Sequence, residues 1–135
     1  MEFARFGATG MRVSRLCLGR MANGSTWRRD KMLDVVASRS FIREASDKRI
    51  NFFETVDVCS TGLTEEILGR ALKDFTNPLD VVILTKALGE TGKVVNTRGH
   101  CRKHILEAID GSLKRMGTDC VDLYQPGRFD PVDAP

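Results

Sequence analysis

Residues 80–86 read DVVILTK, which is the clearest strand signal in the chain. Four consecutive aliphatic residues, from Val81 to Leu84, leave no polar position that would face solvent. Such an uninterrupted run is typical of a strand that is covered on both faces, as in a parallel sheet flanked by helices. Because parallel strands need a crossover connection, the run predicts helices along the chain on either side of it.

The segments before this strand alternate between strand and helix patterns. Residues 2–13 predict a β-hairpin, because alternating polar and apolar residues flank a turn that contains glycine. Strands are predicted near 15–19 and 51–55, and a helix is predicted between them, starting at Asp30. Apolar residues at helical spacing give this helix its expected buried stripe: Leu33, Val36, Ala37, Phe41 and Ala45.

A second helix is predicted after the strand at 51–55. Thr64 is its expected N-terminal cap. Glu65 and Glu66 follow in the first turn, where negative charge is favourable beside the helix dipole. Its expected buried stripe consists of Ile67, Leu68, Ala71 and Leu72.

A third helix is predicted after a polar loop at 87–100. It extends from Cys101, which is a poor N-terminal cap, to Met116, with Gly117 as a C-terminal stop. His104 lies in a basic stretch of this helix and is expected at the surface. The expected apolar face consists of Ile105, Ile109, Leu113 and Met116.

The predicted order is a hairpin followed by β, α, β, α, β, α and β, with the last strand near 119–124. Strands that alternate with helices indicate the α/β class and right-handed parallel units. Two architectures remain open: a doubly wound open sheet, and the first half of a (β/α)8 barrel. No G-x-G-x-x-G follows the first strand, which disfavours a dinucleotide-binding Rossmann domain.

Composition excludes several other classes of protein. The chain is 41% hydrophobic and 29% charged, which is typical of a globular domain. Its net charge of +3 comes from 21 basic and 18 acidic residues that are well mixed, so no nucleic-acid partner is predicted. No apolar run approaches the roughly 20 residues that cross a bilayer, and the N-terminus lacks a signal core, so a cytoplasmic location is predicted. The four cysteines form no C-x-x-C pair and predict no metal site.

Five stretches of the chain, taken together, resemble the aldo-keto reductase family. They keep the family's order and spacing over nearly the whole chain, and they fall within residues 1–19, 50–60, 64–72, 82–86 and 102–131. That family folds as a (β/α)8 TIM barrel with an N-terminal hairpin at its bottom. It reduces aldehydes and ketones with NADPH, which implies NADPH as cofactor and a small carbonyl compound as substrate.

The resemblance implies that residues 1–135 are a single partial domain, a truncated half-barrel. It would contain the hairpin and the first four βα units. Most of the family's contacts to NADPH follow the fourth strand, so this chain is expected to hold few of them. Arg20, Met21 and Glu54 are the cofactor-binding positions that the resemblance assigns, and Arg20 replaces the small residue that is usual there.

Four further positions follow from the family's catalytic aspartate, tyrosine, lysine and histidine. Carried over by position, they are Glu54, Cys59, Lys86 and Gly127. Only Lys86 keeps the family's residue. Glu54 keeps the charge but adds a methylene, which is expected to move its carboxylate relative to the lysine. The short Cys59 side chain cannot reach the position of a phenol hydroxyl, and Gly127 has no side chain to orient a substrate.

Three functional hypotheses result. The leading one is an aldo-keto reductase-like protein whose NADPH-dependent activity is lost or very weak in this chain alone. The second is a non-catalytic interaction module that pairs through the open edges of its sheet. The third is an enzyme that forms only with a partner supplying further strands. Self-association or pairing with a second half-barrel is expected, because the inner face of a half-barrel would be exposed.

Overall fold

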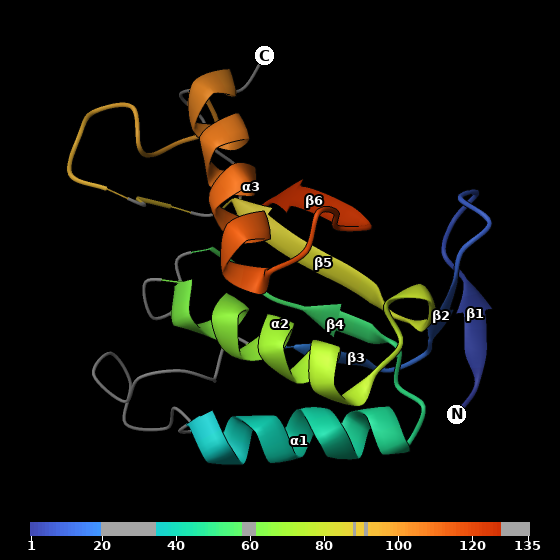
Figure 1. Ribbon diagram of the computed structural model, residues 1–135. Helices are drawn as coiled ribbons and strands as arrows, with labels where there is room; N and C mark the ends of the chain where they lie inside the picture. Colours follow the sequence, from blue (N-terminus) through green and yellow to red (C-terminus); the bar gives the residue numbers. More distant parts are fainter. Residues whose placement is uncertain (20–34, 58–61, 88, 91, 128–135) are drawn as a thin grey trace.

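The computed structural model describes residues 1–19, 35–57, 62–87, 89–90 and 92–127 (Figure 1). The first two strands, β1 (Phe3–Arg5) and β2 (Arg12–Ser14), pair antiparallel within the hairpin predicted over 2–13. Gly7 and Gly10 in the connecting turn have φ angles of 55° and 83°, a conformation that glycine adopts at little cost. The hairpin packs against the main sheet through an edge-to-face contact between the Phe6 and Phe52 rings.

The main sheet has four parallel strands: β3 (Cys17–Gly19), β4 (Phe52–Glu54), β5 (Val82–Ala87) and β6 (Leu123–Pro126). Their spatial order follows their order along the chain. The α/β class and the parallel sheet are therefore confirmed. The last strand lies further along the chain than the predicted range of 119–124, because Thr118 and Cys120 bond to each other in a local turn before the strand begins.

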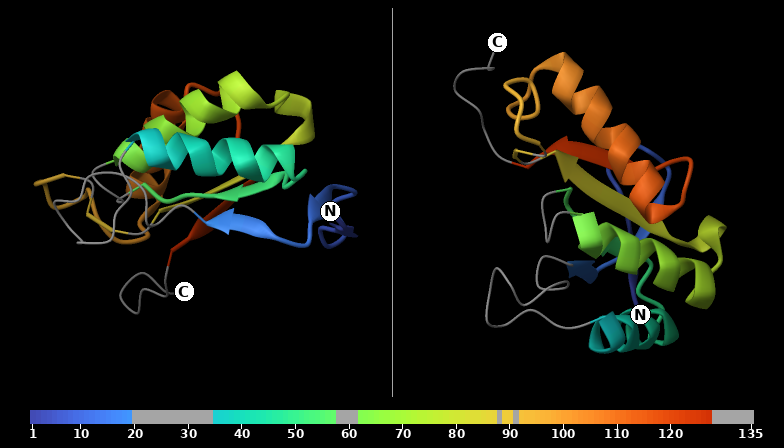
Figure 2. Two further views of the ribbon diagram at one scale, coloured as in Figure 1. Left: turned by 90° about the horizontal axis from the view of Figure 1, so that it is seen from below. Right: turned by 60° about the vertical axis from the view of Figure 1, so that its left-hand side comes forward.

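The three helices are α1 (Val35–Asp47), α2 (Leu63–Phe75) and α3 (Arg102–Met116), and they cover one face of the main sheet (Figure 2). A doubly wound sheet carries helices on both faces. Helices on a single face and strands in sequential order are consistent with part of a (β/α)8 barrel. The four described strands do not close into a barrel.

The hydrophobic core lies between α1, α2 and β4. Phe53, Ile42 and Leu68 are fully buried at its centre. The stripe predicted for α2 is confirmed, since all four of its residues are buried: Ile67, Leu68, Ala71 and Leu72.

The stripe predicted for α1 is largely wrong. Val36 and Phe41 are 75% and 49% exposed. Ala45 is buried as predicted, but the other residues of α1 that face the core are Ser38 and Ile42, which the prediction does not include. Small residues at 38 and 45 let α1 approach α2 closely on either side of one large residue, so this rotation of the helix gains close packing. Leu33 lies outside the described residues.

The buried face of α3 also differs from the prediction. His104 is fully buried, with its Nδ1 atom 2.7 Å from the carbonyl oxygen of Gly99, so the expectation of a surface histidine is wrong. A polar residue can occupy a core position when it is hydrogen-bonded. The buried residues are His104, Ala108, Ser112 and Met116, one position away from most of the predicted apolar face.

The helix ends follow the predicted chemistry in part. Cys101 precedes α3 and makes no side-chain capping bond, and Gly117 ends the helix with a φ angle of 67°, both as predicted. The cap of α2 differs, because Gly62 occupies that position and Thr64 is buried inside the first turn. No helix in the described ranges is long and apolar enough to cross a membrane.

The inner face of the sheet, which is the face opposite the three helices, is less exposed than expected. Val82 and Leu84 on the central strand β5 are only 6% and 5% exposed. On the flanking strands, Phe52 lies beside Val82 and Leu123 lies beside Leu84, so each pair projects to the same face of the sheet. Cys17 on the edge strand β3 is exposed.

Candidate functional site

An ion pair joins Glu54 and Lys86 on the inner face, at the C-terminal ends of two adjacent strands. The Lys86 Nζ atom donates to the Glu54 Oε1 atom, and the two side chains are 19% and 28% exposed respectively. Partial burial strengthens such a pair relative to one on an open surface. Glu54 and Lys86 are therefore in direct contact, although no local sequence pattern predicts that contact.

Strand register explains the contact. Glu54 lies beside Leu84, so Lys86, two residues further along β5, points to the same face of the sheet. Pairing continues beyond the end of β4, because the backbone N–H groups of Thr55 and Asp57 donate to the carbonyl oxygens of Leu84 and Lys86. The backbone at both ends of the ion pair is therefore fixed by the sheet.

Cys17 is a neighbour of this pair that the sequence analysis missed. It lies on β3 two residues before Gly19, and Gly19 lies beside Glu54 in the sheet. Partial burial raises the pKa of the Cys17 thiol to about 11; the Glu54 carboxylate raises it further and the Lys86 ammonium lowers it. The thiol is therefore protonated at neutral pH and is a poor nucleophile. Only the register between strands reveals this proximity.

Gly127 lies immediately after β6, on the strand next to Lys86. Its backbone N–H donates to the carbonyl oxygen of Ala87 at 2.7 Å, which extends the pairing of β5 and β6. On β6, Gln125 lies beside Lys86 in register. Glu54 and Lys86 thus lie on adjacent strands, and the Gly127 backbone directly follows the next strand, β6. Cys59, Arg20 and Met21 lie outside the described residues.

The chain's only tyrosine, Tyr124, faces away from the ion pair. It lies beside Thr85 on the helix-covered face, and its hydroxyl donates to the carbonyl oxygen of Ile105 in α3 at 3.0 Å. Burial raises the pKa of Tyr124 to about 12, and the carboxylates of Asp57 and Glu65 add to this. This phenol therefore holds α3 on the sheet and is not a proton donor at the ion pair.

A second ion pair, also missed from the sequence, anchors the helices behind the site. Glu65 in the first turn of α2 is fully buried, and it accepts hydrogen bonds from Thr85 Oγ1 at 2.7 Å and from Arg115 Nε at 2.6 Å. Arg115 also donates to Ser112 Oγ at 3.3 Å. Because Thr85 precedes Lys86, this network ties β5 to α2 and α3 directly behind the site.

A dinucleotide cofactor needs cationic or backbone donors for its phosphates. Lys86 is the only cation within the strands β3, β4, β5 and β6, and Glu54 already neutralises it. The strand residues described here therefore do not fit the pyrophosphate of NADPH, although they retain a paired lysine and carboxylate.

Proteins that are similar to this chain in sequence indicate its family. The aldo/keto reductase family matches residues 15–134. The chain is 37% identical to versiconal hemiacetal acetate reductase from Aspergillus parasiticus, over 96% of the chain and 43% of that protein. It is 35% identical to a probable voltage-gated potassium channel subunit beta from Oryza sativa subsp. japonica, over 98% of the chain and 40% of that protein.

A bacterial relative gives the same picture. The chain is 35% identical to aldo-keto reductase YhdN from Bacillus subtilis (strain 168), over 98% of the chain and 39% of that protein. The chain thus spans about two fifths of the length of these relatives. From the match over 120 residues, 15 to 134 inclusive, and from these relatives, the chain belongs to the aldo/keto reductase family.

Proposed function

We propose that this chain retains the ion pair of the family's carbonyl-reduction site but does not by itself reduce aldehydes or ketones with NADPH. One observation carries the proposal: Lys86 is paired with Glu54, while the only tyrosine hydroxyl is bonded to α3 on the opposite face of the sheet. Reduction of a carbonyl needs a proton donor within hydrogen-bond reach of the carbonyl oxygen.

The chemistry available at the pair supports this proposal. A lysine beside a phenol makes the phenol a better proton donor. On the face of the described strands that carries Lys86 there is no phenol, and the nearby group that could donate a proton is the Cys17 thiol. That thiol lies two residues deeper along β3 than Gly19, the residue beside Glu54. The two histidines of the chain, His100 and His104, lie at the N-terminal end of α3 and not on the strands that carry the pair.

The length of chain compared with its relatives also supports inactivity on its own. It spans about two fifths of proteins that are named as reductases, so it can provide only part of the site that a whole relative provides. An enzyme formed with further βα units from a partner would supply the rest. A cytoplasmic location and NADPH as the cofactor of such an assembly are parts of the same proposal.

NADPH binding tests the proposal through a fluorescence titration of the purified 135-residue chain. We expect no saturable change, because the strand residues lack phosphate donors. The Lys86→Met variant should give the same flat curve as the parent, and Lys103→Met, an exposed lysine on α3, is the matched control. Saturable binding that Lys86→Met weakens and Lys103→Met does not would contradict the proposal.

A second candidate function is a non-catalytic interaction module. Among the described strands, β3 and β6 each pair on one side only, so each offers a row of free backbone groups to another chain. Proteins named as voltage-gated potassium channel beta subunits are among the similar sequences, so relatives of this chain are named as parts of assemblies. Light scattering over a concentration series tests this: growth in mass with concentration supports it, and an unchanging monomer excludes self-association.

A further inference from the structure

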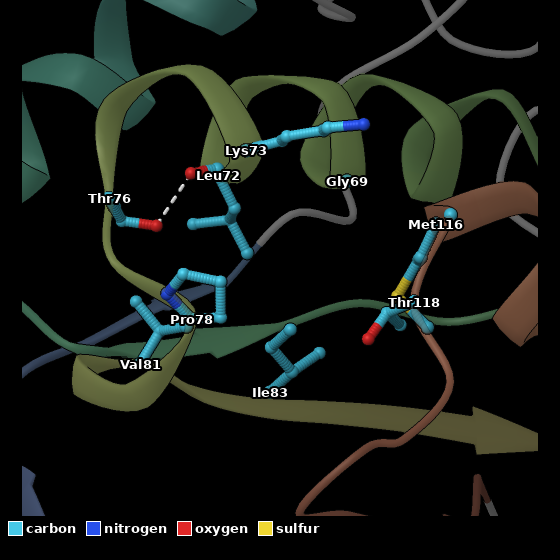
Figure 3. A pocket seen from close by; sticks show the side chains of 10 residues that line it. Gly69, Leu72, Lys73, Thr76, Pro78, Val81, Ile83, Met116 and Thr118 are labelled. Carbon is cyan, nitrogen blue, oxygen red and sulfur yellow. Dashed lines mark hydrogen bonds between the residues drawn. The ribbon is translucent and has the colours of Figure 1, made fainter.

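An apolar cavity of about 210 Å³ opens on the helix-covered side of the sheet, away from the ion pair (Figure 3). In Figure 3, Leu72 extends toward it from α2 and Ile83 extends toward it from β5. The apolar side chains that line it are Leu72, Pro78, Val81, Ile83 and Met116.

The cavity exists because α3 ends before α2 does. The two helices cross at Gly69, where an added Cβ would lie 2.0 Å from the carbonyl oxygen of Met116. Met116 is the last residue of α3, and Gly117 turns the chain away with a φ angle of 67°. On the side that faces α3, the last turn of α2 therefore has no described helix beside it.

Two hydroxyl groups and one cation are the polar side-chain groups that line the cavity. Thr76 Oγ1 donates to the carbonyl oxygen of Leu72 at 2.6 Å, drawn in Figure 3, and Thr118 Oγ1 donates to that of Cys120 at 3.2 Å. The donor of each hydroxyl is thus used within the protein. Lys73 also lines the cavity, is exposed, and forms no ion pair with any described residue.

We infer that this cavity is a binding site for small monocarboxylates with an apolar body. An apolar cavity of about 150 Å³ accommodates benzene, so one ring or a short branched chain fits here. The Lys73 ammonium at the edge attracts the carboxylate. The site is independent of the proposed function, because Ile83 and Lys86 project to opposite faces of β5.

The first test titrates the 135-residue chain with benzoate, toluene and benzylamine and follows backbone amide NMR shifts. Benzoate should give saturable shifts at Gly69, Gly117 and Thr118, toluene weaker ones, and benzylamine the weakest. Lys73→Met should weaken benzoate binding about two- to fivefold, the range of an exposed ion pair, and leave toluene unchanged. Lys103→Met is the control and should change neither.

The second test fills the cavity. Val81→Phe should abolish binding of benzoate and toluene together, and Thr118→Leu is a second filling variant if Val81→Phe does not fold. Saturable binding of neither probe would overturn the inference, as would binding that persists in both filling variants. Equal affinity for benzoate and benzylamine would overturn the assignment to carboxylates.

Discussion

At the scale of single residues, the ion pair shows how a substitution is accommodated. The extra methylene of Glu54 is expected to move its carboxylate relative to the lysine, and in the structure the Lys86 ammonium donates directly to that carboxylate. Gly19 lies on the adjacent strand with no side chain of its own, and the position of an added Cβ there would be 3.9 Å from Glu54 Oε2. That distance is an ordinary van der Waals contact, so a methyl group at position 19 would also leave room for the glutamate.

The pH dependence of Cys17 alkylation should report the charges of Glu54 and Lys86. In a background with serine at positions 59, 101 and 120, alkylation of Cys17 by iodoacetamide should rise steeply only near pH 11, because its thiol pKa is raised to about that value. Glu54→Gln should shift the profile to lower pH and Lys86→Met to higher pH. Identical profiles in both variants would show that the pair does not neighbour Cys17.

The same pKa has a consequence for stability. The pKa of the Cys17 thiol in the folded state lies above its ordinary value of 9.0, so the folded state favours the protonated thiol. The contribution of Cys17 to stability is therefore complete below pH 9.0 and is lost as the pH rises through about 11.

Arg49 should be destabilising where it stands. Its φ angle of 62° is left-handed, which costs a residue with a side chain about 1–2 kcal/mol. Arg49→Gly removes that cost but loses an exposed cation–π contact with Phe3, worth about 0.5–1 kcal/mol. We expect a net stabilisation of about 0.5–1 kcal/mol in urea unfolding. Lys48→Gly is the control and should destabilise; equal destabilisation by both variants would contradict this account.

At the scale of elements, the sequence predicts the buried face of a helix well only where the apolar residues all lie on one face of that helix. The stripe of α2 is correct because its apolar residues form a single face. In α1, apolar residues occur at Val36 and Phe41 as well as at Ile42, and tertiary packing buries Ile42 together with the predicted Ala45 while it leaves Val36 and Phe41 exposed. A hydrophobic pattern does not find a polar core residue such as His104, whose burial depends on a hydrogen bond to the Gly99 carbonyl in the loop before the helix.

The crossing of α2 and α3 depends on Gly69. Gly69→Ala would place a Cβ 2.0 Å from a backbone oxygen of Met116, so the helices must separate. Overpacking of this kind costs about 1–3 kcal/mol, and the better helix propensity of alanine offsets about 1 kcal/mol of it. We expect a lower urea midpoint, and a loss of the closest contact between the helices.

The same substitution in α3 is the control for Gly69. At Gly111 an added Cβ would meet the Arg115 Nη1 atom at 3.0 Å, and that atom is the end of a flexible side chain. Gly111→Ala should therefore cost much less than Gly69→Ala. Similar midpoints for the two variants would show that the backbone contact at Gly69 does not limit the crossing.

At the scale of the whole molecule, the alternation of strands and helices identifies the class but not the architecture. The choice between a doubly wound sheet and a barrel-like one depends on which face the helices cover, and that follows from the tertiary arrangement rather than from periodicity. The structure places all three helices on one face (Figure 2). The family resemblance, by contrast, assigned Glu54 and Lys86 to one site, and the sheet register brings them into contact.

The central claim is that a paired lysine without a tyrosine at its side does not support carbonyl reduction. Absorbance of NADPH, followed with a simple aldehyde and the purified chain as the only protein, measures this most directly. We predict a rate no higher than that of the protein-free mixture. Oxidation of NADPH that depends on the aldehyde and disappears in Lys86→Met would contradict the claim.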